Sequence, residues 1–92
     1  MSARVSRRAL VDLLGGDTQL VDMLEEAGVI PCRDLAPVEV ENALVARTLL
    51  RELDVNMAGV EVVIRLRTEL QQTRLQVRHL AQIVRKMQPP EP

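Results

Sequence analysis

The 92-residue sequence contains no phenylalanine, tyrosine or tryptophan, and its apolar residues are leucine, valine, isoleucine, alanine and methionine. Without aromatic side chains the chain lacks the stacking platforms on which proteins usually bind single-stranded nucleic acid. Aromatic cross-strand pairs, which stabilise many β-sheets, are also excluded. We see no strand pattern and no internal repeat, and we predict an all-α protein.

Cysteine is nearly absent as well, because Cys32 is the only one. A single thiol excludes an intramolecular disulfide and is typical of a reducing compartment. Residues 1–8 lead into no long apolar run, so no secretory signal is visible. The uncharged apolar stretches are too short to cross a bilayer. We expect a soluble cytoplasmic protein with no membrane contact.

Groups for catalysis or metal binding are also few. A zinc site needs about four ligands at characteristic spacing, and Cys32 and His79 lie alone on distant segments. There is no nucleophile–base pattern, no glycine-rich phosphate loop and no carboxylate pair with a histidine. We therefore expect no enzymatic activity, no metal and no cofactor, and we interpret His79 as an ordinary surface residue.

Basic residues are scarce in residues 11–54, where three arginines stand against ten acidic residues, a net charge of −7. The acidic residues are Asp12, Asp17, Asp22, Glu25, Glu26, Asp34, Glu39, Glu41, Glu52 and Asp54. Binding to a DNA duplex begins with Lys and Arg displacing its counterions, so this segment would be repelled. The charge favours a protein partner.

The N-terminal half is predicted to form two short helices, over about 7–14 and 18–27, joined by a glycine-containing turn. This arrangement is typical of a helix–turn–helix. Capping residues bound both helices. The candidate N-caps are Ser6 for the first helix and Asp17 or Thr18 for the second, and glycines 15, 16 and 28 follow the helix ends.

Two longer helices are predicted to follow. Pro37 suits the first turn of a helix that runs to about Leu53. Its expected apolar stripe is interrupted by Arg47 and consists of Val40, Leu44, Leu50 and Leu53. Asn56 is placed to cap a last helix over 57–88, which a pair of prolines then closes.

The last helix carries the most regular pattern of the chain, a heptad seam over nearly four repeats. Its a and d positions are Val63, Leu66, Leu70, Thr73, Val77, Leu80, Val84 and Met87. Most of this seam has nothing to bury it within one chain, so we predict a homodimer through these residues. Glu69 and Arg74, at g and e positions, are placed to attract each other in a parallel pair.

Three segments resemble known proteins. Residues 25–30, Glu-Glu-Ala-Gly-Val-Ile, and residues 51–60 resemble parts of MerR-type regulators. Residues 53–66, Leu-Asp-Val-Asn-Met-Ala-Gly-Val-Glu-Val-Val-Ile-Arg-Leu, are similar to the MerR-like chaperone modulators called CbpM. The resemblance implies three parts: a MerR-like helix–turn–helix without a wing over 1–55, a coiled-coil dimerisation helix over 56–88, and a tail over 89–92. In MerR relatives the two dimerisation helices pair antiparallel, and we expect the same here.

The chain departs from DNA-binding MerR proteins where they hold DNA. Those regulators carry an Arg-Tyr-Tyr or Arg-Tyr-Trp run in the recognition helix, and the aligned residues here are Asp22, Met23 and Leu24. A basic wing should follow Ile30, but only residues 31–36 precede the next helix. Phosphate contacts position a reader on the duplex, so DNA is an unlikely partner.

The CbpM resemblance implies a chaperone modulator. Such proteins bind the J-domain of a DnaJ-like co-chaperone and regulate, by inhibition in our interpretation, its action with Hsp70. The expected contacts to the basic J-domain face are Asp12, Asp22, Glu25 and Glu26. The alternatives are a solvated acidic face, a scaffold that bridges chaperone and co-chaperone, and a MerR-family DNA-binding transcriptional regulator.

Two groups of cations have open interpretations. Arg4, Arg7 and Arg8 lie near the start of the first helix, where positive charge opposes the macrodipole. They either meet carboxylates elsewhere or serve an external acidic surface, or they are simply exposed. Residues 56–88 have a net charge of +4. This basic surface has three interpretations. It is either the solvated back of a coiled coil, or a residual nucleic-acid surface, or a surface that pairs with the acidic segment of a second subunit.

Overall fold

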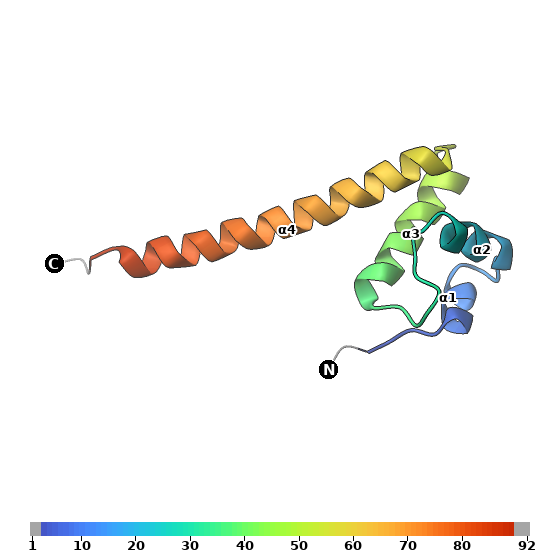
Figure 1. The fold of residues 1–92 in the computed structure, drawn as a ribbon, viewed down its shortest axis with the longest axis horizontal. Helices are drawn as coiled ribbons and strands as arrows, with labels where there is room; N and C mark the ends of the chain where they lie inside the picture. The colour runs from blue at the N-terminus through green and yellow to red at the C-terminus, as the bar shows by residue number, and fades with distance from the viewer. Residues whose placement is uncertain (1–2, 90–92) are drawn as a thin grey trace.

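A computed structural model describes residues 3–89 and contains four helices in this range (Figure 1). They are α1 (Arg7–Leu13), α2 (Thr18–Glu26), α3 (Pro37–Arg51) and α4 (Met57–Met87). The only β-structure in residues 3–89 is an isolated antiparallel bridge between Val5 and Leu35. The all-α prediction is confirmed, and each helix lies within two residues of its expected range.

The first two helices begin at predicted caps. The Ser6 hydroxyl accepts a hydrogen bond from the Ala9 backbone N–H at 3.1 Å. The Asp17 carboxylate accepts one from the Leu20 N–H at 3.0 Å, so Asp17 rather than Thr18 caps α2. Each bond satisfies a backbone donor that a helix start leaves without a partner.

The end of α2 follows from Gly28, whose φ of +74° lies in the left-handed region. The turn allows the Val29 N–H to bond the Leu24 carbonyl at 2.9 Å and the Gly28 N–H to bond the Glu25 carbonyl at 3.1 Å. These two bonds form a Schellman motif, in which glycine is favoured because it has no Cβ. The chain is thereby redirected toward α4.

One core joins all four helices. It contains no buried polar residue in the described part of the chain, and two of its members come from the segment between α2 and α3. Its buried residues are Leu10, Leu14, Leu20, Val21, Leu24, Ile30, Leu35, Ala43, Ala46, Val60 and Ile64.

The stripe expected on α3 is partly wrong. Leu44 is 40 % exposed and Leu53 is 62 % exposed, whereas Ala43 and Ala46 are fully buried. The helix therefore turns its small residues toward the core, which brings its backbone close to its neighbours. It also ends at Arg51, so Leu53 lies outside the helix in the turn to α4.

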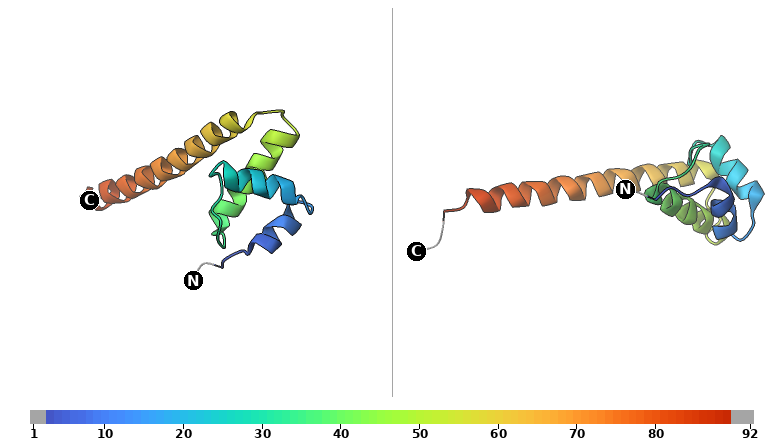
Figure 2. Two further views of the ribbon diagram at one scale, coloured as in Figure 1. Left: turned by 45° about the vertical axis from the view of Figure 1, so that its right-hand side comes forward. Right: turned by 90° about the horizontal axis from the view of Figure 1, so that it is seen from below.

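The long helix α4 is capped by Asn56, whose side chain accepts from the Gly59 N–H at 2.8 Å. Its first turns contribute Val60 and Ile64 to the core. The remainder projects away from the other helices (Figures 1 and 2), and every residue from 72 to 89 is exposed. With 31 residues, at about 1.5 Å of rise each, α4 accounts for most of the 63 Å length of the molecule. No helix of the described chain is both long and apolar enough to cross a membrane.

A matched pair of leucine substitutions tests this core. Leu24 is fully buried on α2, whereas Leu13 is 52 % exposed on α1. We expect Leu24→Ala to lower the free energy of unfolding by about 3 kcal/mol and Leu13→Ala by less than about 1 kcal/mol. Urea unfolding followed by circular dichroism measures both. Equal losses would contradict the described packing.

Candidate partner-binding surfaces

Three of the four predicted acidic contacts lie together. Asp22, Glu25 and Glu26, all on α2, line one shallow depression with the exposed Cys32. Asp12 does not line this depression and belongs to α1. The α2 helix contains no lysine or arginine, so its exposed side presents carboxylates without basic neighbours on the same helix.

Arg7 of α1 reaches this acidic surface. Its guanidinium forms an ion pair with Asp22 and donates a hydrogen bond from Nε to Glu25 at 3.1 Å. The hydrogen bond to Glu25 raises the pKa of Arg7, and the nearby charges of Glu25 and Asp22 act in the same direction. The sequence left open whether the N-terminal arginines bind carboxylates of the chain, serve an external surface or are simply exposed. Arg7 binds carboxylates of its own chain. Because 18 and 15 residues separate these pairs, sequence spacing carried no signal of them.

The carboxylates of the acidic surface differ in their exposure and in whether they pair with Arg7. The Glu25 side chain is only 15 % exposed, whereas that of Asp22 is 63 % exposed although it holds Arg7. Asp12 and Glu26 are exposed and have no cation within 4 Å among residues 3–89. Asp22 and Glu26 are therefore open to solvent, whereas Glu25 is largely covered and already paired with Arg7.

The connection from α2 to α3 is held tightly against the body of the protein. Leu35 is buried and exchanges two backbone hydrogen bonds with Val5, each 2.8 Å long. Arg33 donates two hydrogen bonds to the Glu39 carboxylate, at 3.1 and 3.0 Å. Glu39 also accepts from the Ala36 backbone N–H at 2.7 Å. The segment where a wing would be expected is thus a short closed loop without a projecting hairpin.

The α4 helix has two apolar faces on different sides. Val60 and Ile64 face the core, and Arg67 and Gln71 continue that side with partial burial. Each residue advances about 100° around a helix, so Leu66 lies about 120° around α4 from Val60. The predicted seam therefore lies on a different side of α4 from the core, and beyond Val63 the body of the same chain does not cover it.

Most seam side chains are well exposed. Val63, next to the core, is half-buried and Thr73 is exposed. The other six range from 49 to 76 % exposure: Leu66, Leu70, Val77, Leu80, Val84 and Met87. An apolar stripe, interrupted by Thr73, is therefore open to solvent along most of α4.

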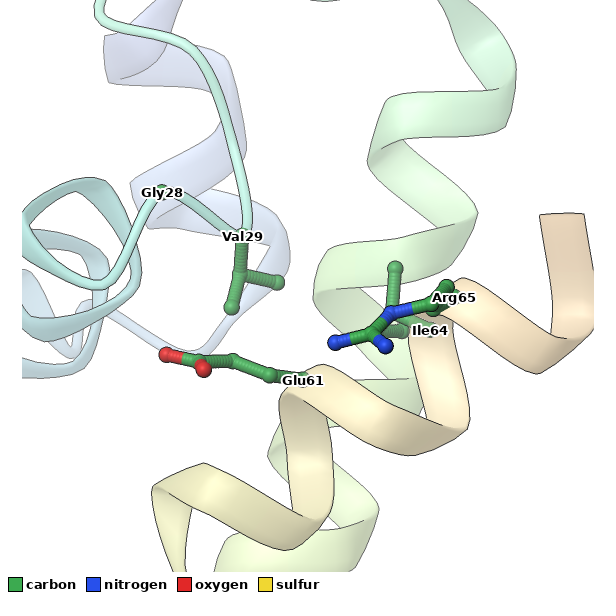
Figure 3. Close-up of a pocket in the computed structure, with 5 residues that line it drawn as sticks. All are labelled: Gly28, Val29, Glu61, Ile64 and Arg65. Atoms are coloured by element: carbon green, nitrogen blue, oxygen red, sulfur yellow. The ribbon is translucent and has the colours of Figure 1, made fainter.

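A further depression lies where the turn after α2 meets α4 (Figure 3). Gly28 and Val29 form one side, and Ile64 lies on the other. Glu61 and Arg65, one helical turn apart on α4, project toward the Gly28–Val29 turn. Sequence reasoning missed this feature because the two segments lie more than 30 residues apart and only the fold joins them.

Groups for metal chemistry do not gather in the described chain. No set of three histidine, cysteine or acidic residues within residues 3–89 is placed to hold an ion. His79 is exposed on α4, as predicted for a surface residue.

Stability should depend on pH through Glu39. The backbone hydrogen bond from Ala36, followed by the hydrogen bond from Arg33, lowers the pKa of Glu39 below its ordinary value of 4.5. A depressed carboxyl pKa contributes stability above the unfolded-state pKa, and this is lost as pH falls through the folded-state value. We expect wild type to have a larger free energy of unfolding than Glu39→Gln. This difference should be constant near neutral pH and should shrink as the pH falls from 4.5. Urea unfolding across this range measures it, and a difference independent of pH would contradict the assignment.

Comparisons with protein-family models, with curated proteins and with solved structures find no match for this chain. The two surfaces, the acidic side of α2 and the exposed seam of α4, are therefore interpreted from their geometry and charge.

Proposed function

We propose that this protein is a chaperone modulator of the CbpM type, with a wingless MerR-like helix–turn–helix formed by α1 and α2. It binds the J-domain of a DnaJ-like co-chaperone through the acidic side of α2 and inhibits the action of that co-chaperone with Hsp70. The observation that carries the proposal is an α2 surface with exposed carboxylates and no cation of its own.

The loop between α2 and α3 supports a protein partner over DNA. Residues 31–36 are fastened by the Val5–Leu35 bridge and by the bonds of Glu39, and only Arg33 among them is basic. That arginine is already engaged by Glu39. A duplex would therefore meet carboxylates on α2 and find no group in this loop ready to replace its counterions.

Recognition would rest on charge complementarity between α2 and the basic face of a J-domain. Asp22 and Glu26 are the direct contacts in this proposal, while Glu25 holds Arg7 in place. Complementary charge raises the association rate and selects among partners more than it adds affinity. The complex should therefore weaken as salt concentration rises.

Charge reversal on α2 tests the proposal. Asp22→Lys with Glu26→Lys should weaken binding to a purified J-domain by about tenfold or more, because attraction becomes repulsion. The matched control is Glu52→Lys with Asp54→Lys, which makes the same charge change in the exposed turn before α4. Isothermal titration calorimetry measures binding, and circular dichroism checks that each variant is folded.

Unchanged binding in the α2 variant, or equal loss in the control, would remove α2 as the contact surface.

A gel-shift titration at low salt tests the alternative function, DNA binding. A specific complex with duplex DNA that weakens steeply with salt would favour the MerR-type transcriptional regulator over the modulator. Hsp70 ATPase assays then separate inhibition from scaffolding.

We further propose that the protein acts as a homodimer formed through the α4 seam. The seam lies on a different side of α4 from the core, and its distal part contacts nothing else in the described chain. A second copy offers the same stripe and buries both, as in a two-stranded coiled coil. Valine at three of the four a positions fits two strands.

Two leucines on α4 give a matched test of the dimer. Leu70 lies in the seam and is 49 % exposed, whereas Leu75 lies at an f position outside it and is 61 % exposed. We expect Leu70→Glu to convert the dimer to a monomer and Leu75→Glu to leave it intact, because only the first buries a charge in the interface. Sedimentation velocity distinguishes the two states. A monomeric wild type, or a dimeric Leu70→Glu variant, would reject the seam as the interface.

A further inference from the structure

An apolar hollow adjoins the acidic side of α2. It has a volume of about 520 Å³ and is lined by Met23 and Ala27 at the end of α2, by Met57 at the start of α4, and by Glu26. The three apolar residues are half-buried, whereas Glu26 is exposed. Because α2 and α4 are distant in the sequence, only the fold forms this hollow. We call it the methionine hollow.

Glu26 belongs to two depressions at once. It lines the methionine hollow and also the acidic depression that it shares with Asp22 and Glu25. At about 100° per residue, Met23 lies about 60° around α2 from Glu26, between the carboxylates and the buried side of the helix. Arg7 pairs with Asp22 and Glu25, but Glu26 has no cation within 4 Å among residues 3–89. An unpaired carboxylate thus stands at the edge of an apolar hollow.

This combination matches the chemistry of a long basic side chain. Lysine and arginine carry a positive charge at the end of an apolar stem, and the stem is buried along apolar surface wherever the charge can remain satisfied. Methionine side chains are flexible and adapt their shape to what they contact. The methionine hollow supplies an apolar lining for the stem and one carboxylate for the charge.

We propose that the methionine hollow binds one lysine or arginine side chain of the partner protein. The stem packs on Met23 and Met57, and the charged end pairs with Glu26. This inference rests on the function proposed above and adds the anchor residue of the contact. A purely apolar side chain in the hollow would leave Glu26 without a cation, and a cation bound only at the surface would leave the hollow empty.

The neighbouring depressions are less suited to a basic side chain. In the acidic depression, Asp22 and Glu25 already hold Arg7. In the depression beside the Gly28–Val29 turn, Arg65 lines the site and would repel a second cation (Figure 3). Charge therefore favours the methionine hollow as the place for the anchor residue.

A double-mutant cycle tests whether one side chain makes both contacts. Met23→Ala should raise the dissociation constant for a purified J-domain by about fivefold, equally at about 0.05 M and about 0.5 M NaCl, because the lost contact is apolar. Glu26→Gln should raise it by about fivefold at the lower salt concentration and much less at the higher. The double variant should lose less than the product of the two single losses, because both substitutions release the same side chain.

Two controls accompany the cycle. Leu44→Ala is the matched apolar control, because Leu44 is 40 % exposed on α3 and lines neither the methionine hollow nor the acidic depression. In a second cycle, the effects of Met23→Ala and Asp22→Asn should multiply, because Asp22 does not line the methionine hollow. Isothermal titration calorimetry measures every variant, and circular dichroism checks that each is folded.

The methionine methyl groups report on the hollow in the unaltered protein. The chain has four methionines, so ¹³C-methyl labelling gives few signals. The Met23 and Met57 signals should shift when the J-domain is added. Met23→Leu and Met57→Leu variants identify the two signals.

The outcomes separate this inference from the function on which it rests. A J-domain that does not bind the wild type rejects both. Binding that is lost on charge reversal of α2, but with no loss in Met23→Ala and unshifted methionine signals, overturns the anchor and leaves the acidic contact standing. Losses that multiply in the cycle of Met23 and Glu26, or an equal loss in Leu44→Ala, overturn the anchor as well.

Discussion

The packing of Val60 and Ile64 into the N-terminal core sets the orientation of every other residue of α4. A helix is rigid over this length, so fixing one face at its start fixes all the others along it. The apolar seam is thereby turned outward, about 120° around α4 from the side that the core occupies. The proposed dimer interface of α4 depends on these two buried side chains.

A separation of charge follows from the same geometry. Ten of the 13 acidic residues belong to α1–α3 and the connections that follow them, while the distal α4 is basic and projects beyond them. Within the compact part, arginines neutralise several carboxylates: Arg7 holds Asp22 and Glu25, and Arg33 holds Glu39. Exposed carboxylates remain on α2, and exposed arginines remain on α4.

The helices and their caps were predictable because their signals are local. Ser6, Asp17 and Asn56 bond backbone groups three residues ahead, and Gly28 supplies the left-handed turn that ends α2. The heptad spacing of α4 is likewise visible in the residue types alone. The stripe of α3 was mispredicted because the buried positions are alanines, whose weak hydrophobicity gives no periodic signal, and because exposed leucines suggested a different face.

The all-helical character, the positions of the helix ends and the long apolar seam of α4 could be predicted from the order of the residues. The packing of the helices was needed to learn that Arg7 binds the carboxylates of α2, that residues 31–36 close into a short loop, and that the seam lies on a different side from the core. Helix formation depends on neighbours within a turn of the chain. Ion pairs and the direction of a helix face depend on residues brought together from distant segments, which spacing along the chain does not reveal.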